Sequence, residues 1–402
     1  MIVYRAKWIL PISGPPIQHG WLAIQQGRVV AVESAHQTPP SKPIDLGDVV
    51  ILPSLVNAHT HLEFSDLTAP MGYAGIRLHD WIGEVVRSRS LQAADDRADS
   101  ATAIRQGLRQ TVRAGVGLIG DIATTPVSSL PSLLPPTTDL ISMAEVLGLV
   151  VTRSEEKLAL AREHVDRLAN HSSISPGISP HAPYSTPLCV VDRCIEIATE
   201  KNLPLAMHVA ESIEERELIE RGQGPFAAKL KQIQVYEDSI FPWGRNATLQ
   251  LLHRLAQAPR TLIVHGNDLR NDEIDFVAKH QNLTVVYCPR THAYFDHPPH
   301  PVSKLLAVGV RVALGTDSLA SNPDLSLWNE VQWLLAHRQD IPWQSVLEMA
   351  TIHGADALAR RDIGRIQCGA KASLLTIPTM ATAIDGLPES FLAHQPSWLG
   401  SV

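Results

Sequence analysis

Two histidines separated by one residue, His59 and His61, end an apolar run in the stretch LPSLVNAHTHLEFSD. In a β-strand, residues i and i+2 point to the same face, so both imidazoles would converge on one spot. Two neutral imidazoles directed at one point suit a divalent metal ion. They equally suit a polar strand end that meets solvent, so the pair alone does not decide between the two.

Four more apolar runs end in residues that could bind a metal or move a proton. They are ISPHAPYS with His181, PLAMHVAES with His208 and Glu211, TLIVHGND with His265, and VALGTDS with Asp317. A single histidine at a strand end is usually a satisfied polar terminus. Because histidines recur at so many run ends and an aspartate joins them, a shared metal site explains the pattern better than independent coincidence.

The elements that must position these residues are eight apolar runs, with helical patterns between them. The runs cover 51–58, 116–122, 140–147, 174–181, 205–208, 261–265, 283–288 and 310–317. Apolar runs alternating with amphipathic helices indicate an α/β fold of βα units, whose parallel strands are buried on both faces. Eight units predict a (β/α)₈ TIM-like barrel, which gathers functional residues at the C-terminal ends of its strands.

The two chain ends have a different texture, with short strand-like pieces and glycine or proline punctuation. The segment GWLAIQQGRVVAV predicts a hairpin with Gln26 and Gly27 near its turn. Near the C-terminus, IGRIQCGAKASLLTIP predicts a second short strand pair. These pieces fit a small domain beside the barrel.

Composition excludes several classes of function. The chain has 402 residues and a formal net charge of −7 at pH 7, whereas a nucleic-acid surface needs a basic patch. Four scattered cysteines without a C-x-x-C pair predict a reducing, cytoplasmic setting. From the residues given we expect no signal peptide, and no apolar run approaches membrane-spanning length. The expected partner is a small-molecule substrate, without nucleic acid or membrane, and the sequence leaves a homodimer open.

The motifs NAHTHLEFS, SPHAPYS, MHVAESIEE, VHGNDL and LGTDSLASNPDLSLWNE resemble those of the amidohydrolase superfamily. Within it they are similar to the chlorohydrolase and aminohydrolase branch, which includes adenosine-type and cytosine-type deaminases. The resemblance implies a metal-dependent hydrolase barrel over residues 51–361. It also implies a composite β-sandwich domain built from residues 1–50 and 362–402.

The resemblance also implies the ligand set of the metal, namely His59, His61, His208 and Asp317. Relatives with two metals bridge them with a lysine after the fourth strand, and the stretch ISPGISPHAPYS has none. We therefore expect one divalent ion. Three imidazoles and a carboxylate suit zinc and also iron; zinc is our expectation and Fe²⁺ the alternative. The P-C-x-x-C ligands of zinc cytidine deaminases are absent from the sequence.

In deaminases of this type, hydroxide formed at the metal adds to the ring carbon that carries the amine, and ammonia leaves. Asp317 would accept the proton of the water, and His265 would hold that water by a hydrogen bond. Glu211 would protonate the ring nitrogen, although a carboxylate at the start of a helix is its ordinary alternative. His181 would contact the substrate, with a structural role as the alternative.

The pattern HLEFS…W…R resembles aminodeoxyfutalosine deaminases, which act in menaquinone biosynthesis on an adenine nucleoside with a carboxyphenyl tail. Arg87 or Arg89 would grip that carboxylate, unless both are solvated charges on a helix. Glu63 and Ser321 are further expected substrate contacts. His292 stands where many relatives have asparagine after the seventh strand, which could change the substrate contacts.

Other readings of the site remain open. A deaminase or chlorohydrolase could act on S-adenosylhomocysteine, guanine, cytosine or a triazine, and a cyclic-amide hydrolase of the imidazolonepropionase type is a further alternative. A metal-free scaffold is disfavoured because the ligand set is complete.

Overall fold

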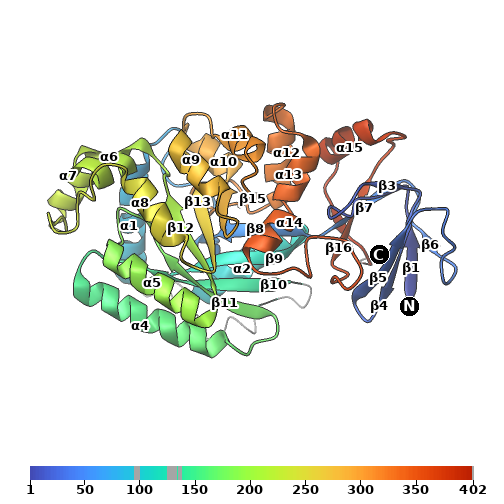
Figure 1. Ribbon diagram of the computed structural model, residues 1–402, viewed down its shortest axis with the longest axis horizontal. Helices are drawn as coiled ribbons and strands as arrows, with labels where there is room; N and C mark the ends of the chain where they lie inside the picture. The colour runs from blue at the N-terminus through green and yellow to red at the C-terminus, as the bar shows by residue number, and fades with distance from the viewer. Residues whose placement is uncertain (95–99, 125–133, 135–137, 401–402) are drawn as a thin grey trace.

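The computed structural model describes residues 1–94, 100–124, 134 and 138–400 (Figure 1). Eight parallel strands, hydrogen-bonded to one another in chain order, confirm the predicted (β/α)₈ barrel. They are β8 (Leu55–Thr60), β9 (Val116–Ala123), β10 (Asp139–Val146), β11 (Ile174–Pro180), β12 (Pro204–Val209), β13 (Arg260–His265), β14 (Leu283–Tyr287) and β15 (Val312–Leu314). The first strand meets the segment directly after the last one through an isolated parallel bridge between Thr60 and Asp317.

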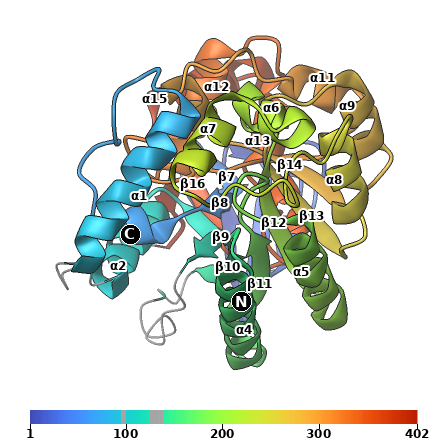
Figure 2. The same cartoon turned by 90° about the vertical axis from the view of Figure 1, so that its left-hand side faces the viewer.

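Helices surround the barrel; in Figure 2, α4, α5, α8 and α9 lie around the central strands. The helices described are α1 (Leu78–Ala94), α2 (Ser100–Arg113), α4 (Val151–Leu168), α5 (Leu188–Lys201), α6 (Ile213–Arg221), α7 (Gly224–Gln232), α8 (Ala247–Leu255), α9 (Asn271–Ala278), α10 (Pro289–Tyr294), α11 (Val302–Ala307), α12 (Leu327–His337), α13 (Trp343–Met349), α14 (Ile352–Ala357) and α15 (Leu387–Ala393), with short 3₁₀ turns η1 (Leu62–Phe64) and η2 (Ile384–Gly386). Among the described residues, none of these helices is long and apolar enough to span a bilayer.

Alternation along each strand builds two cores. On β10, Ile141 and Met143 belong to one buried cluster, whereas Leu140 and Ala144 belong to another. Successive side chains of a strand point to opposite faces, so one cluster fills the barrel and the other packs under the helices. This two-sided burial is why the barrel strands read as nearly continuous apolar runs.

Two further sheets, one from the N-terminal segment and one from both chain ends, lie at one end of the molecule together with the two termini (Figure 1). One sheet has the order β5 (Arg28–Glu33), β4 (Trp21–Gln25), β1 (Ile2–Arg5) and β6 (Ile44–Asp45). The other has the order β17 (Ser397–Trp398), β16 (Leu374–Pro378), β7 (Val49–Pro53), β2 (Trp8–Ile9) and β3 (Ile17–Gln18). Leu22 and Val29 of the first sheet share a buried cluster with Ile51 and Leu374 of the second, so the sheets pack as a sandwich.

The predicted N-terminal hairpin is confirmed, because β4 and β5 pair antiparallel across Gln26 and Gly27. Both turn residues have positive φ, 51° and 71°, as a two-residue type I′ turn requires. The predicted C-terminal strand pair is wrong. Only β16 forms, and in place of the first strand the chain makes one isolated bridge between Lys371 and Arg28.

The apolar run 51–58, which we predicted as one barrel strand, is divided at Ser54. Its first part belongs to β7, which pairs with β16 in the sandwich, and its second part is the barrel strand β8. Both sheets bury the residues of this run. Hydrophobicity alone therefore does not mark where the chain passes from one sheet to the other.

Candidate metal centre and active site

The predicted ligands meet where the barrel closes. His59 lies at the end of β8, and its carbonyl oxygen accepts hydrogen bonds from the backbone N–H groups of Thr316 and Asp317 at 3.1 and 3.2 Å. Asp317 has a left-handed φ of 55°, and its Oδ1 lies 3.6 Å from Nε2 of His59 and 3.6 Å from Nε2 of His61. Strand pairing thus brings together residues from opposite ends of the barrel sequence.

His208 completes the cluster from β12. Its Nδ1 lies 2.8 Å from the carbonyl oxygen of His181, to which it can only donate, so Nε2 keeps a free lone pair. His59, His61 and His208 each offer a ring nitrogen, and these nitrogens lie within 4.8 Å of one another. Among the described residues, these three histidines are the cluster whose ligand atoms lie close enough together to hold a metal ion.

A divalent cation fits this donor set. Both ring nitrogens of His59 are buried without a hydrogen-bond partner, a condition that costs free energy unless a ligand satisfies them. Burial lowers the pKa of His61, and it lowers the pKa of His208 to about 3. Both imidazoles are therefore neutral, as metal ligands must be.

Glu211 and His265 lie beside the cluster, and Oε1 of the first is 3.4 Å from Nε2 of the second. The His265 ring centroid is 5.4 Å from that of His208. Burial, followed by the negative charges of Asp317 and Glu215, raises the pKa of Glu211 well above its usual range. A buried carboxyl that keeps its proton near neutral pH can act as a general acid.

Three predicted substrate residues also reach this end of the barrel. Ser321 donates a hydrogen bond of 2.8 Å from Oγ to Oδ2 of Asp317, which makes it a partner of a predicted ligand. The His181 ring lies 5.0 Å from that of His208, and its Nδ1 is 2.6 Å from Oγ of Ser185. Glu63, in η1 directly after His61, is half-buried and forms an ion pair with Arg89.

Arg87 is the predicted substrate residue that the structure does not bring to the cluster. Its side chain is 65% exposed and pairs with Glu84 one turn earlier on α1, at 2.8 Å. Arg89, two positions further along the helix, is 35% exposed, and its guanidinium lies 4.4 Å from the centre of the Phe64 ring. Of the two arginines weighed for a carboxylate, Arg89 is the one adjacent to the site.

Sequence reasoning missed Glu145. This buried residue at the end of β10 accepts a 2.6 Å hydrogen bond from Thr124, and its Oε1 lies 4.0 Å from Nε2 of His181. A signal was available, because Glu145 is the one charged residue of the run 140–147 and stands near its C-terminal end. That is where a barrel places functional groups.

His292 lies in α10 and turns toward its own loop. Its Nε2 is 2.9 Å from the carbonyl oxygen of Pro298, and its ring contacts those of Tyr287 and His300. His300 in turn donates from Nε2 to the carbonyl oxygen of His265 at 2.9 Å. The histidines of this loop therefore support the backbone behind the site.

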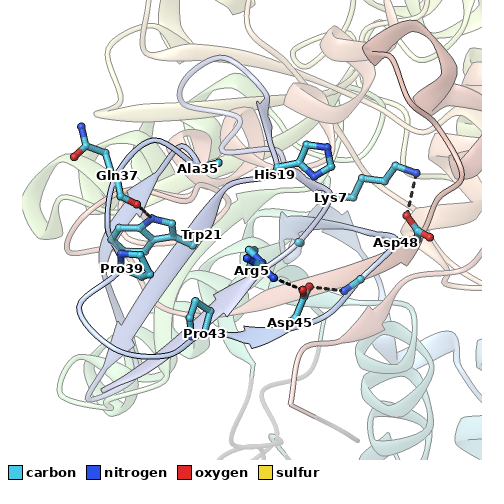
Figure 3. A pocket seen from close by; sticks show the side chains of 12 residues that line it. Arg5, Lys7, His19, Trp21, Ala35, Gln37, Pro39, Pro43, Asp45 and Asp48 are labelled. Carbon is cyan, nitrogen blue, oxygen red and sulfur yellow. Dashed lines mark hydrogen bonds and ion pairs between the residues drawn. The ribbon is translucent and has the colours of Figure 1, made fainter.

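A separate hollow of about 390 Å³ lies on the sandwich (Figure 3). Its charged side chains are already paired, Arg5 with Asp45 at 2.5 Å and Lys7 with Asp48 at 3.0 Å. None of the predicted site residues lines it. The sandwich hollow is therefore distinct from the cluster of predicted metal ligands.

Comparison with known proteins agrees with this geometry. The 5-methylthioadenosine/S-adenosylhomocysteine deaminase of Nitratidesulfovibrio vulgaris is 29% identical over 414 residues, covering 94% of this chain and 84% of the relative. The aminodeoxyfutalosine deaminase of Deinococcus radiodurans is 31% identical over 294 residues, covering 70% of this chain and 67% of the relative. The crystal structure of Helicobacter pylori aminofutalosine deaminase in complex with methylthio-coformycin shares the fold, with a TM-score of 0.85, 22% identity, and coverage of 98% and 97% of the two chains.

The model of the amidohydrolase family matches residues 50–393, which is the barrel with the strand that leads into it and most of the C-terminal segment. This agrees with the resemblance seen in the sequence motifs. The chain therefore belongs to the amidohydrolase family and is a hydrolase that acts on carbon–nitrogen bonds.

Proposed function

We propose that this protein is a metal-dependent deaminase of an adenine nucleoside derivative, with aminodeoxyfutalosine as the first candidate substrate. The observation that carries the proposal is the buried Glu211 next to His265, at the edge of the cluster formed by three histidines and Asp317. Hydrolysis of an amide does not require a general acid in this place, whereas deamination of a purine must protonate a ring nitrogen. The relatives named above, which act on adenine nucleoside derivatives, add support.

His59, His61, His208 and Asp317 would hold the metal ion, for which we propose zinc, with iron as the alternative. When bound, such an ion acts as a Lewis acid that lowers the pKa of a water molecule to about 7. Ser321 fixes Oδ2 of Asp317 by its hydrogen bond. Oδ1 is the oxygen that faces His59 in β8 and His61 directly after it.

The protons are moved by the chain's own side chains. As water adds to the ring carbon that bears the amine, Asp317 accepts a proton from the water and His265 holds the water by a hydrogen bond. Glu211 delivers its proton to the adjacent ring nitrogen, so that no negative charge accumulates there. Glu211 then takes the proton of the new hydroxyl group and passes it to the amine as the carbon–nitrogen bond breaks. Ammonia leaves, the ring keeps a carbonyl oxygen, and the proton held by Asp317 restores the acid form of Glu211.

Arg89 is the residue we propose for a carboxylate tail. It emerges from α1 over Phe64, and a substrate carboxylate would compete with Glu63 for its guanidinium. Burial raises the pKa of Glu63, which weakens Glu63 as a competitor. The same ion pair favours a second candidate, methylthioadenosine, because a neutral tail leaves Arg89 and Glu63 paired.

The test is ammonia release by the metal-loaded protein from aminodeoxyfutalosine, methylthioadenosine, S-adenosylhomocysteine, adenosine, guanine and cytosine. Preference for aminodeoxyfutalosine supports the first candidate, and Arg89→Ala should then raise KM for aminodeoxyfutalosine but not for adenosine. Arg87→Ala is the matched control, since it removes the same charge two positions earlier. Silence on every amine, with one metal ion bound per chain, would refute the deaminase and favour a cyclic-amide hydrolase.

A further inference from the structure

The residue between the metal cluster and the proposed acid has a strained backbone. Ala210 directly follows β12 and precedes Glu211, and its φ is 53°. A residue with a Cβ atom pays about 1 to 2 kcal/mol to adopt this left-handed conformation. Such a turn persists only where surrounding contacts hold it. The position of Glu211 therefore depends on what holds Ala210.

Glu215 holds this turn through both of its carboxylate oxygens. Oε1 accepts the backbone N–H of Ala210 at 2.7 Å, and Oε2 accepts that of Glu211 at 3.4 Å. The side chain is fully buried, with 0% exposure. In an ordinary capping box, the glutamate at the third helical position bonds the N–H of the capping residue. Here Ser212 caps α6, and Glu215 reaches past it to the two residues before.

The carbonyl groups of the same two residues are satisfied from the opposite side. The backbone N–H of Asp268 donates to the carbonyl oxygen of Ala210 at 2.8 Å, and Nδ2 of Asn267 donates to that of Glu211 at 3.0 Å. Both donors belong to the loop that follows His265. All four polar backbone groups of the turn thus have partners, and these partners join the turn to the loop that follows the proposed water-holding histidine.

The helix that carries Glu215 cannot easily shift. The next residue, Arg216, is 2% exposed and donates to Glu273 at 2.7 Å and to Asp268 at 2.5 Å. Removing one partner of such a buried ion pair would be strongly destabilising. Glu215 is therefore held in place by its helix, and it in turn holds the backbone of Ala210 and Glu211.

We propose that Glu215 is a positioning residue for Glu211, setting the place of the acid carboxyl relative to His265 without touching the substrate. The inference rests on the proposed function, in which Glu211 moves the proton. A displacement of about 1 Å at a reacting group can cost about 100-fold in rate. We call the two hydrogen bonds from Ala210 and Glu211 to Glu215 the clamp. Its loss should therefore lower kcat, while KM and metal binding stay near their original values.

The experiment uses Glu215→Gln in the metal-loaded, full-length protein, on whichever substrate the unaltered protein turns over. The amide oxygen of glutamine accepts only one of the two N–H groups, and its NH₂ faces the other. We expect kcat to fall about 10- to 100-fold with KM within about twofold of the original and one metal ion per chain. The matched control is Glu214→Gln, whose carboxylate pairs with Arg77 at 3.5 Å, away from the turn; its kcat should not change.

A double variant separates positioning from a general structural role. If Glu215 acts only by placing Glu211, then Glu215→Gln should cost nothing further in a Glu211→Gln background. Losses that multiply in the double variant, or a single-variant kcat within twofold of the original, would overturn the proposal.

Hydrogen exchange in the unaltered protein tests the clamp even if the Glu215→Gln variant does not fold. The amide hydrogens of Ala210 and Glu211 should be strongly protected from exchange, as buried hydrogen bonds require. Exchange as fast as that of exposed loops would refute the clamp. This readout is independent of turnover, so a failure of the proposed deaminase activity and a failure of the clamp are distinguishable.

Discussion

Replacing Glu211 by glutamine tests the proposed proton transfer directly. The side chain is 6% exposed, and its Oε1 lies 3.4 Å from Nε2 of His265. Burial, followed by the charges of Asp317 and Glu215, raises its pKa well above the usual range of a glutamate, which favours the protonated form that a general acid needs. The amide of glutamine has the same shape and fills the same space, but it has no acidic proton to give to the substrate.

The expected loss is large because the same carboxyl serves twice, first toward the ring nitrogen and then toward the departing ammonia. General acid–base catalysis contributes about 100- to 10,000-fold to a rate, and about 1.4 kcal/mol of activation free energy corresponds to each factor of ten. For Glu211→Gln we expect the upper half of that range, a fall in kcat of about 1,000- to 10,000-fold. Metal content should stay at one ion per chain, because Glu211 is not among the proposed ligands.

The assay is steady-state ammonia release, with the metal content of each preparation measured by emission spectroscopy. Glu214→Gln also serves as the control for this variant, since this neighbouring glutamate is 9% exposed and pairs with Arg77. A Glu211→Gln enzyme that keeps its metal and turns over within tenfold of the original would refute the assignment of the ring proton.

Removing the metal with a chelator should abolish turnover and lower the melting temperature, and one equivalent of zinc should restore both, because the nitrogens of His59 have no partner within the protein; an unchanged melting temperature would contradict this. Asn57→Ala should lower the free energy of unfolding in urea by about 2 to 3 kcal/mol, because Oγ1 and N of Thr316 both lose a buried partner; a midpoint equal to the original would exclude that role. Burial lowers the pKa of His292 to about 4 and that of His300 to about 3, whereas an unfolded histidine titrates at about 6.5. The unfolded state therefore binds more protons below pH 6.5, so stability should fall as the pH drops from 6.5 toward 4. His292→Gln should flatten this slope by up to about 1.4 kcal/mol per pH unit, and unfolding curves with equal pH dependence would contradict it.

The barrel and the placement of polar residues at its strand ends were predictable because both follow from local patterns. His59 and His61 reveal their common direction through the two-residue period of a strand, and the eight apolar runs reveal the parallel sheet through burial on both faces. The division of the first run at Ser54 was not predictable. Residues on either side of it are equally buried, in β7 and in β8, so hydrophobicity carried no information about the change of sheet.

The choice between Arg87 and Arg89 shows a second limit. Two positions along a helix are separated by about 200° around its axis, so only one of the two arginines could face the site. The sequence could not say which one, because the deciding contacts come from distant segments. Arg89 meets Glu63, 26 positions away, whereas Arg87 meets Glu84 on its own helix. Glu215 is similar, since the capping pattern predicts a helix start and not a bond to Ala210.

The ligand set also depends on the completeness of the fold. The carboxylate of Asp317 faces His59 only because the backbone of 316 and 317 is hydrogen-bonded to the end of β8, and this contact joins the first barrel strand to the residues after the last. Asn57 reinforces the same closure through Thr316. No partial barrel that lacks β15 can present all four proposed ligands. Since His59 and Asp317 both close the barrel through their backbones and offer their side chains as proposed ligands, we expect a bound metal ion to stabilise the closed barrel and a loosened barrel to bind the ion less tightly.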